Sequence, residues 1–311
     1  MKRNLMLAGL VMVLLVLVGS TTSAVAKVKI VATLSDLGSV AQIVGGDDVE
    51  VTVLCPGEMD PHFLPAKPSL ARKLSKADML IYNGLELEVG WLPQLINKAR
   101  NPDIKPGSIG EVDCSAAVKE LLEVPGANVD RSEGDVHPQG NPHYTLDPRR
   151  VVKVAELLAE RLGRIDGDHA EAYLARAAAF ASEVAVREAA WRAQTEKARA
   201  IPMVIYHRTW SYLVDWLGLD VVGEIEHRPG ISPSPRHVQE LVERSRKRDQ
   251  TLVVAASWDH RHIAVEVAER MGAELVVIPA QTGASDSATD YFALLDTICR
   301  ELAAAADRAG E

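Results

Sequence analysis

Hydrophobic and polar positions follow two alternating periods along the chain. Short runs of β-branched residues are each followed by a helix-like pattern, and this alternation is typical of α/β units around parallel sheets. Four such runs occur in each half of the chain, so we predict two lobes, each a roughly four-stranded, mainly parallel sheet flanked by helices. The predicted strands span residues 28–33, 49–54, 79–82 and, more weakly, 108–112 in the first half, and 203–206, 221–225, 252–256 and 275–278 in the second.

The longest uninterrupted helical pattern lies between these two sets. Residues 168–201 contain no Gly or Pro, and about 30 helical residues reach roughly 45 Å. We therefore expect one long, rigid helix that joins an N-terminal lobe, residues 27–167, to a C-terminal lobe, residues 202–311, and that disfavours wide hinge closure. Two helices with an unmarked break are the alternative. The predicted buried stripe, spaced by four, three, four and seven residues, comprises Tyr173, Ala177, Phe180, Val184 and Trp191.

The first residues have the order of a secretory signal. Lys2 and Arg3 precede an apolar run over residues 5–18, and small residues end at Ala26, which predicts a signal peptide over residues 1–26. A membrane span needs about 20 apolar residues, more than this run offers. Because no cysteine follows the run until Cys55, we expect an exported, periplasmic protein without a lipid anchor.

Charge and cysteine content exclude some classes of partner and site. The formal net charge is -9, and removal of the two positive charges of the signal gives -9 - 2 = -11. An acidic surface argues against nucleic acid as a partner. Cys55, Cys114 and Cys299 form no CxxC pair, so they do not predict a thiolate metal site, and whether two of them pair stays open.

Three of the nine histidines share a structural setting. His62 follows the strand at 49–54, His143 precedes a helix in "GNPHYTLDP", and His207 follows the strand at 203–206. Ligands of parallel α/β sheets gather at the carboxyl ends of strands, and three neutral imidazoles with one open position suit Zn²⁺. Such a site fits a binding protein. It also fits a zinc hydrolase in which Glu58 or Asp60 acts as a base, although no HExxH motif is present.

The remaining histidines are weaker candidates. His137 lies in a Gly-, Pro- and Asp-rich segment, about residues 124–142, which we expect to be a mobile loop. We expect its ring to be solvated and at most to capture metal transiently. His260 and His262, in "WDHRH", fit a minor surface site or an exposed helix cap. The others are expected on exposed polar segments: His169, His227 and His237.

Four stretches resemble motifs of the periplasmic zinc- and manganese-binding proteins of ABC importers, some of which are named adhesins. They read "MDPHFLPAKPSLARKLSKADMLIYNGLELEVGWL", "NPHYTLDP", "VIYHRTWSYLVDWLGL" and "GISPSPRHVQELVE". The resemblance implies two four-stranded lobes joined by a long helix, with the metal between them. It implies His62, His143 and His207 as ligands, no catalytic activity, and delivery of the ion to an ABC permease in the inner membrane. We expect a monomer.

The resemblance leaves the metal and its fourth ligand open. Manganese-selective members carry a carboxylate where this chain has His207, so Zn(II) is expected over Mn(II), which favours oxygen. A manganese-binding or adhesin-type relative stays the alternative. Many members place an Asp after the last strand, where this chain has Gln281 in "IPAQTGASDSATDY". The fourth ligand is therefore water, Gln281, Glu226 or Asp286.

Overall fold

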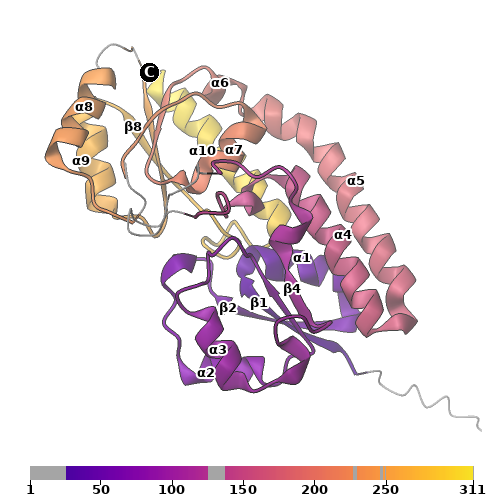
Figure 1. The fold of residues 1–311 in the computed structure, drawn as a ribbon. Coiled ribbons are helices and arrows are strands. Elements are labelled where there is room, and N and C mark those ends of the chain that lie inside the picture. Colours follow the sequence, from indigo (N-terminus) through magenta and orange to yellow (C-terminus); the bar gives the residue numbers. More distant parts are fainter. Residues whose placement is uncertain (1–25, 125–136, 227–229, 246–247, 249, 311) are drawn as a thin grey trace, which may run out of the picture.

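The computed structural model describes residues 26–124, 137–226, 230–245, 248 and 250–310. The predicted signal peptide, apart from Ala26, and most of the predicted loop at 124–142 lie outside these residues. In the described part of the chain, no helix is both long and apolar enough to cross a membrane. All eight predicted strands are present, in two parallel four-stranded sheets, and this confirms the predicted fold class (Figure 1).

The N-terminal sheet has the strand order β2-β1-β3-β4. Alternate residues of β1 face opposite sides: Ile30 and Ala32 contact one apolar cluster, and Val31 contacts another. Helices α1 and α4 cover the first side, and α2 and α3 cover the second. The elements are β1 (Val28–Leu34), α1 (Ser35–Gly45), β2 (Val49–Cys55), α2 (Pro68–Leu74), β3 (Met79–Tyr82), α3 (Leu92–Ala99), β4 (Glu111–Asp113) and α4 (Pro148–Ile165).

The C-terminal sheet repeats this plan with the order β6-β5-β7-β8. Helices α7 and α10 pack on one side, and α8 and α9 pack on the other. The first side continues into the apolar cluster beneath α1 and α4. The two lobes therefore share one core. The elements are β5 (Met203–Ile205), α7 (Ser211–Leu217), β6 (Val221–Glu224), α8 (Pro235–Ser245), β7 (Leu252–Ala256), α9 (Arg261–Met271), β8 (Glu274–Ile278) and α10 (Tyr291–Ala309).

The predicted helix over residues 168–201 is two helices, α5 (Ala170–Gln194) and α6 (Glu196–Arg199). The break falls at Thr195, whose hydroxyl donates to the carbonyl of Trp191 at 2.9 Å, a bond that bends helices. The predicted stripe of five apolar residues is the buried face of α5.

Helix α5 contacts both lobes, as Figure 1 shows. Near its start, Arg176 donates to Asp48 at 2.6 Å in the N-terminal lobe. Near its end, the indole N–H of Trp191 donates to Asp296 of α10 at 2.6 Å. The helix is thus fixed at both ends, and this geometry disfavours large relative motion of the lobes.

A second set of contacts joins the lobes directly, and we call it the interlobe seam: Ser35, Asp36, Ser39, Thr145, Gln281, Thr282 and Tyr291. Asp36, fully buried at the start of α1, accepts hydrogen bonds from the backbone N–H and the hydroxyl of Thr282 at 2.7 and 2.9 Å. Tyr291 donates its hydroxyl to the carbonyl of Thr145 at 2.8 Å. The backbone N–H of Tyr291 also donates to the hydroxyl of Ser39 at 2.9 Å, a bond between residues 252 positions apart.

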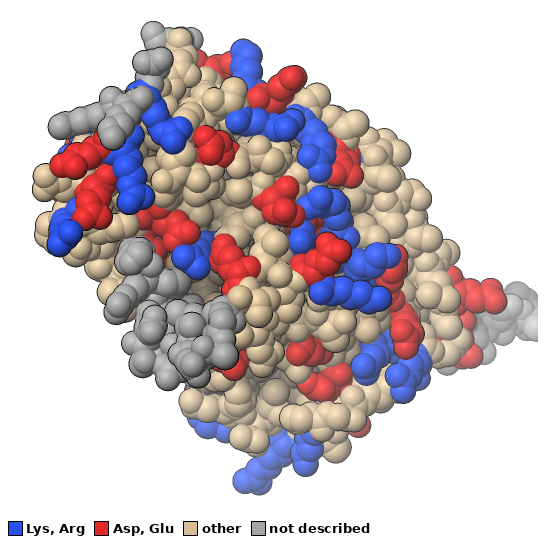
Figure 2. Space-filling view, turned by 45° about the horizontal axis from the view of Figure 1, so that its top comes forward, with Lys and Arg blue, Asp and Glu red and all other residues tan. Residues whose placement is uncertain are grey.

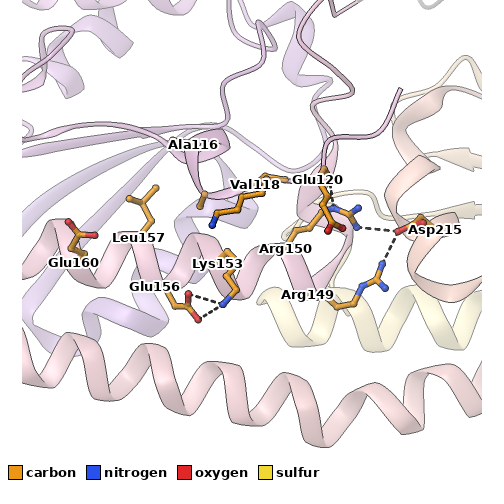
Figure 3. Close-up of a pocket in the computed structure, with 12 residues that line it drawn as sticks. Ala116, Val118, Glu120, Arg149, Arg150, Lys153, Glu156, Leu157, Glu160 and Asp215 are labelled. Atoms are coloured by element: carbon orange, nitrogen blue, oxygen red, sulfur yellow. Dashed lines mark hydrogen bonds and ion pairs between the residues drawn. The ribbon is translucent and has the colours of Figure 1, made fainter. Parts of the chain in front are cut away.

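A surface hollow of about 810 Å³ lies over α4 and is bordered by Asp215 of α7 (Figure 3). Its cations are matched by carboxylates: Arg149 contacts Asp215 at 2.8 Å, and Lys153 contacts Glu156 at 2.9 Å. Basic and acidic side chains are likewise interspersed on the face drawn in Figure 2. The hollow therefore lacks the unbalanced charge that a charged ligand requires.

Candidate metal centre

The structure brings together the three histidines that the sequence singled out. One ligand nitrogen of each of His62, His143 and His207 lies within 4.8 Å of the other two. The ring centroids are 5.2 to 5.7 Å apart, and each residue is less than a tenth exposed. The cluster lies where the carboxyl ends of the two sheets face each other, so it draws one ring from the C-terminal lobe and two from the N-terminal lobe.

His62 is oriented by the residue two positions before it. It lies in a short 3-10 helix, Pro61–Phe63, which follows β2. Asp60 accepts from the backbone N–H of His62 at 2.9 Å and contacts its ring Nδ1 at 2.7 Å. Burial opposes ionisation of Asp60, but the bonds to His62 outweigh it and lower the pKa of this carboxyl. Because Nδ1 carries the proton shared with Asp60, Nε2 is left as the ligand atom.

His143 is held by the loop before α4. The Asn141 side chain accepts from the His143 N–H at 2.8 Å, and the Asn83 amide donates to the carbonyl of Pro142 at 2.8 Å. The His143 Nε2 atom is buried and has no hydrogen-bond partner among the described residues. Desolvation, together with the neighbouring rings of His62, His207 and His137, lowers the pKa of His143 well below its usual value. The ring is therefore kept neutral, as a metal ligand must be.

His207 lies two residues after the end of β5, and a carboxylate contacts its ring. Glu226 contacts its Nδ1 at 3.0 Å and also accepts from the N–H of Gly230 at 3.1 Å. Burial, and the charges of Glu226 and Asp60, raise the pKa of nearby Asp259 to about 7. A cavity of about 180 Å³ borders His62, His207 and these three carboxylates. The negative charge of Asp60 and Glu226 favours a cation at the histidine cluster.

His137 is buried, and the expectation that it is solvated is wrong. It is 8 % exposed, its Nδ1 contacts the carbonyl of Leu85 at 3.0 Å, and its Nε2 lies 3.3 Å from the Nε2 of His62. Sequence reasoning missed this because its partners lie 52 and 75 positions away.

The other histidines lie apart from the cluster or at its margin. His260 borders the cavity beside His207, and its ring centroid is 5.9 Å from that of His262; both residues are exposed. His169 and His237 are only half exposed, contrary to expectation, because their rings contact Asp166 and the carbonyl of Glu224. His227 lies outside the described residues.

The protein side chains considered for the fourth ligand are engaged elsewhere or exposed. Gln281 accepts from the hydroxyl of Ser35 at 3.1 Å, Glu226 supports His207, and Asp286 is exposed. Of the two possible bases, Glu58 is exposed and Asp60 is bonded to His62. The three cysteines are free thiols, all buried, so none of them pairs.

Comparison with known proteins identifies the family. The model of the family described as "Zinc-uptake complex component A periplasmic", ZnuA, matches residues 30–305. The zinc-binding lipoprotein AdcA of Streptococcus pneumoniae is 25% identical over 251 residues, 79% of this chain but 48% of AdcA, so the chain spans about half the length of that relative. The manganese-binding lipoprotein MntA of Halalkalibacterium halodurans is 27% identical over 251 residues, 79% of this chain and 77% of MntA.

Solved structures share the fold. A crystal structure of ZnuA superposes with a TM-score of 0.74 at 22% identity and covers 90% of this chain and 99% of that one. A manganese-bound periplasmic metal-binding protein from Candidatus Liberibacter asiaticus gives 0.73 at 19% identity, over 90% and 100% of the two chains. Both the fold and the family model agree with the resemblance seen in the sequence. Relatives include PsaA of Streptococcus pneumoniae, named a manganese ABC transporter substrate-binding lipoprotein. The chain belongs to the ZnuA family.

Proposed function

We propose that this protein captures Zn(II) between its two lobes through His62, His143 and His207 and delivers it to an ABC importer. The observation that carries the proposal is the convergence of three ligand nitrogens within 4.8 Å of one another. Two of the rings are oriented by carboxylates on their opposite nitrogens, the arrangement that fixes the tautomer of metal-binding histidines.

The donor set favours zinc over manganese. Imidazole nitrogen suits Zn²⁺, whereas Mn²⁺ prefers carboxylate, carbonyl and water oxygen. AdcA is named for zinc and MntA for manganese, so family membership leaves the metal open. The chemistry of the three rings supports zinc as the cargo, with Mn(II) bound more weakly.

The proposal also covers export of the protein and release of the bound ion. The signal-like N-terminus supports a periplasmic protein, with an ABC permease of the inner membrane as its partner. The absence of a lipid anchor has no support from the relatives, several of which are named lipoproteins. The shared core and the seam favour release through small tilts of the lobes or movement of one ligand loop rather than a wide hinge.

Metal analysis and calorimetry on the mature protein test the zinc site. We expect one zinc per chain, and loss of about 100- to 1,000-fold in affinity for His62→Ala, His143→Ala and His207→Ala, because about 10–16 kcal/mol of binding energy is shared among the ligands of a zinc site. His262→Ala, which removes an exposed imidazole, is the control and should bind as the wild type does. Unchanged binding in any of the three ligand variants removes that residue from the site.

A further inference from the structure

We propose that His137 supplies the fourth nitrogen of the metal site, so that the bound ion has four imidazole ligands and no water. This inference rests on the proposed function, because it extends the same three-histidine site. It assigns a ligand that lies in sequence just before His143 but reaches the cluster beside His62.

The tautomers of two rings point to a shared cation. Nδ1 of His62 faces the carboxylate of Asp60 at 2.7 Å, and Nδ1 of His137 faces the carbonyl of Leu85 at 3.0 Å. Both partners are acceptors, so both Nδ1 atoms carry protons. In a neutral ring the other nitrogen, Nε2, then carries a free lone pair. Two lone pairs 3.3 Å apart repel each other unless a positive ion or an added proton lies between them.

The spacing of these two nitrogens matches a zinc tetrahedron. Two nitrogens bound to Zn²⁺ at about 2.0–2.1 Å with tetrahedral angles lie about 3.3–3.4 Å apart. The His62 and His137 Nε2 atoms already have this separation. The nitrogens of His62, His143 and His207 span up to 4.8 Å, so the cluster must contract around the ion and His137 must turn toward the other two rings.

The surroundings hold His137 where a ligand is needed. Its ring is buried and packs against that of His62 with centroids 5.4 Å apart. Gln281 and Glu226 are bonded to Ser35 and His207, whereas Nε2 of His137 lies 3.3 Å from Nε2 of His62. A fourth imidazole in place of an oxygen ligand strengthens the preference for zinc over manganese.

The first test is a titration of the metal-free protein with Zn²⁺ and separately with Mn²⁺. Variants His137→Ala and His137→Gln, which differ in size but both lack the ring nitrogen, are compared with wild type and with the control His262→Ala. We expect both His137 variants to keep one-to-one binding but to lose about 100-fold in zinc affinity, because the binding energy of a zinc site is shared among its ligands. Manganese affinity should fall less than zinc affinity, so the ratio of zinc affinity to manganese affinity should decrease.

The second test is a crystal structure of the zinc-loaded wild type, with visible spectra of the Co²⁺ forms. We expect four Nε2 atoms on the zinc, and a cobalt spectrum that changes in both His137 variants and not in His262→Ala. A water in place of His137, or zinc affinity unchanged in both variants, overturns the fourth ligand while the three-histidine site stands. Absence of tight zinc binding in the wild type overturns the proposed function itself.

Discussion

The histidine cluster and the interlobe seam both bury polar side chains where the two lobes meet, but their bonding differs. In the seam, Asp36 and Tyr291 have partners on the opposite lobe. In the cluster, the partners of the rings lie behind them, and the facing nitrogens meet one another; Nε2 of His143 has no partner among the described residues. The contacts of the seam thus cross from one lobe to the other, although Oδ2 of Asp36 is also buried without a partner among the described residues. The facing atoms of the cluster are ring nitrogens, which suit a positive ion between them. The same boundary thus holds the lobes together in the seam and, under the proposed function, binds the ion in the cluster.

The largest expected effect separates the two regions by their response to zinc. A ligand that binds only the folded state stabilises it by about 4 kcal/mol at 1,000 times its dissociation constant. We expect zinc to raise the free energy of unfolding of the wild type by this amount. At the same zinc concentration the gain should fall to about 0.4–1.4 kcal/mol in His207→Ala, which we expect to bind roughly 100- to 1,000-fold more weakly. It should persist in Asp36→Asn, as measured by denaturant unfolding with and without zinc. A gain that falls equally in both variants would show that cluster and seam are one unit.

How far the sequence predicts these regions depends on the range of the contacts. All eight strands were predictable because runs of β-branched residues are local signals. His62, His143 and His207 were predictable because each lies beside the end of a strand or the start of a helix. The seam was not, since Asp36 and Thr282 are 246 positions apart and neither has a local signal.

The sequence does not place the break at Thr195, which was only the alternative to one long helix, and it does not indicate the burial of His137. No Gly or Pro marks residue 195, and the hydroxyl of Thr195 shares the carbonyl of Trp191 with the backbone N–H of the same residue, a local contact that the apolar pattern does not reveal. The position of His137 depends on the carbonyl of Leu85 and the ring of His62. The Gly-, Pro- and Asp-rich sequence around His137 indicates a loop. Composition does not reveal which side chains of a loop are buried.

The second-largest expected effect is a pH dependence of stability that arises from Asp36 in the seam. Desolvation raises the pKa of Asp36 from 3.8 to about 6. The folded state therefore keeps this proton where the unfolded state has lost it. Stability from this group is fully present below about pH 3.8 and is lost as the pH rises through about 6. The difference corresponds to at most about 3 kcal/mol.

Asp36→Asn tests this dependence, since the amide keeps the shape and cannot ionise. Glu88 and Asp259 have pKa values raised to about 7 and act in the same direction, so the comparison must be between variant and wild type. In metal-free protein, we expect the variant to gain stability relative to wild type between pH 4 and pH 7, measured by denaturant unfolding. A difference that is flat with pH would show that Asp36 is ionised throughout.

A smaller effect concerns the carboxylates that support the ligand rings. Glu226→Gln and Asp60→Asn keep the side-chain shape but remove the charge behind His207 and His62. Loss of such partners reduces metal affinity by about 10- to 100-fold, and we expect this range in zinc calorimetry. Glu58→Gln is the matched control, because Glu58 lies in the same loop as Asp60 but is exposed. An equal loss in this control would mean that overall charge, not ring orientation, sets the affinity.

The smallest effect tests whether the seam positions the cluster. The hydroxyl of Tyr291 donates to the carbonyl of Thr145 at 2.8 Å, and Thr145 lies two residues after His143. Tyr291→Phe removes this one bond and leaves a buried carbonyl unpaired, which should cost about 1–3 kcal/mol of stability. Because Asn141 and Asn83 hold the His143 loop independently, we expect zinc affinity to change less than about threefold, or roughly 0.6 kcal/mol. A tenfold loss of zinc affinity in this variant, with one-to-one binding retained, would contradict this expectation. It would mean that the C-terminal lobe sets the position of His143 through Tyr291, and that the seam and the cluster are energetically coupled.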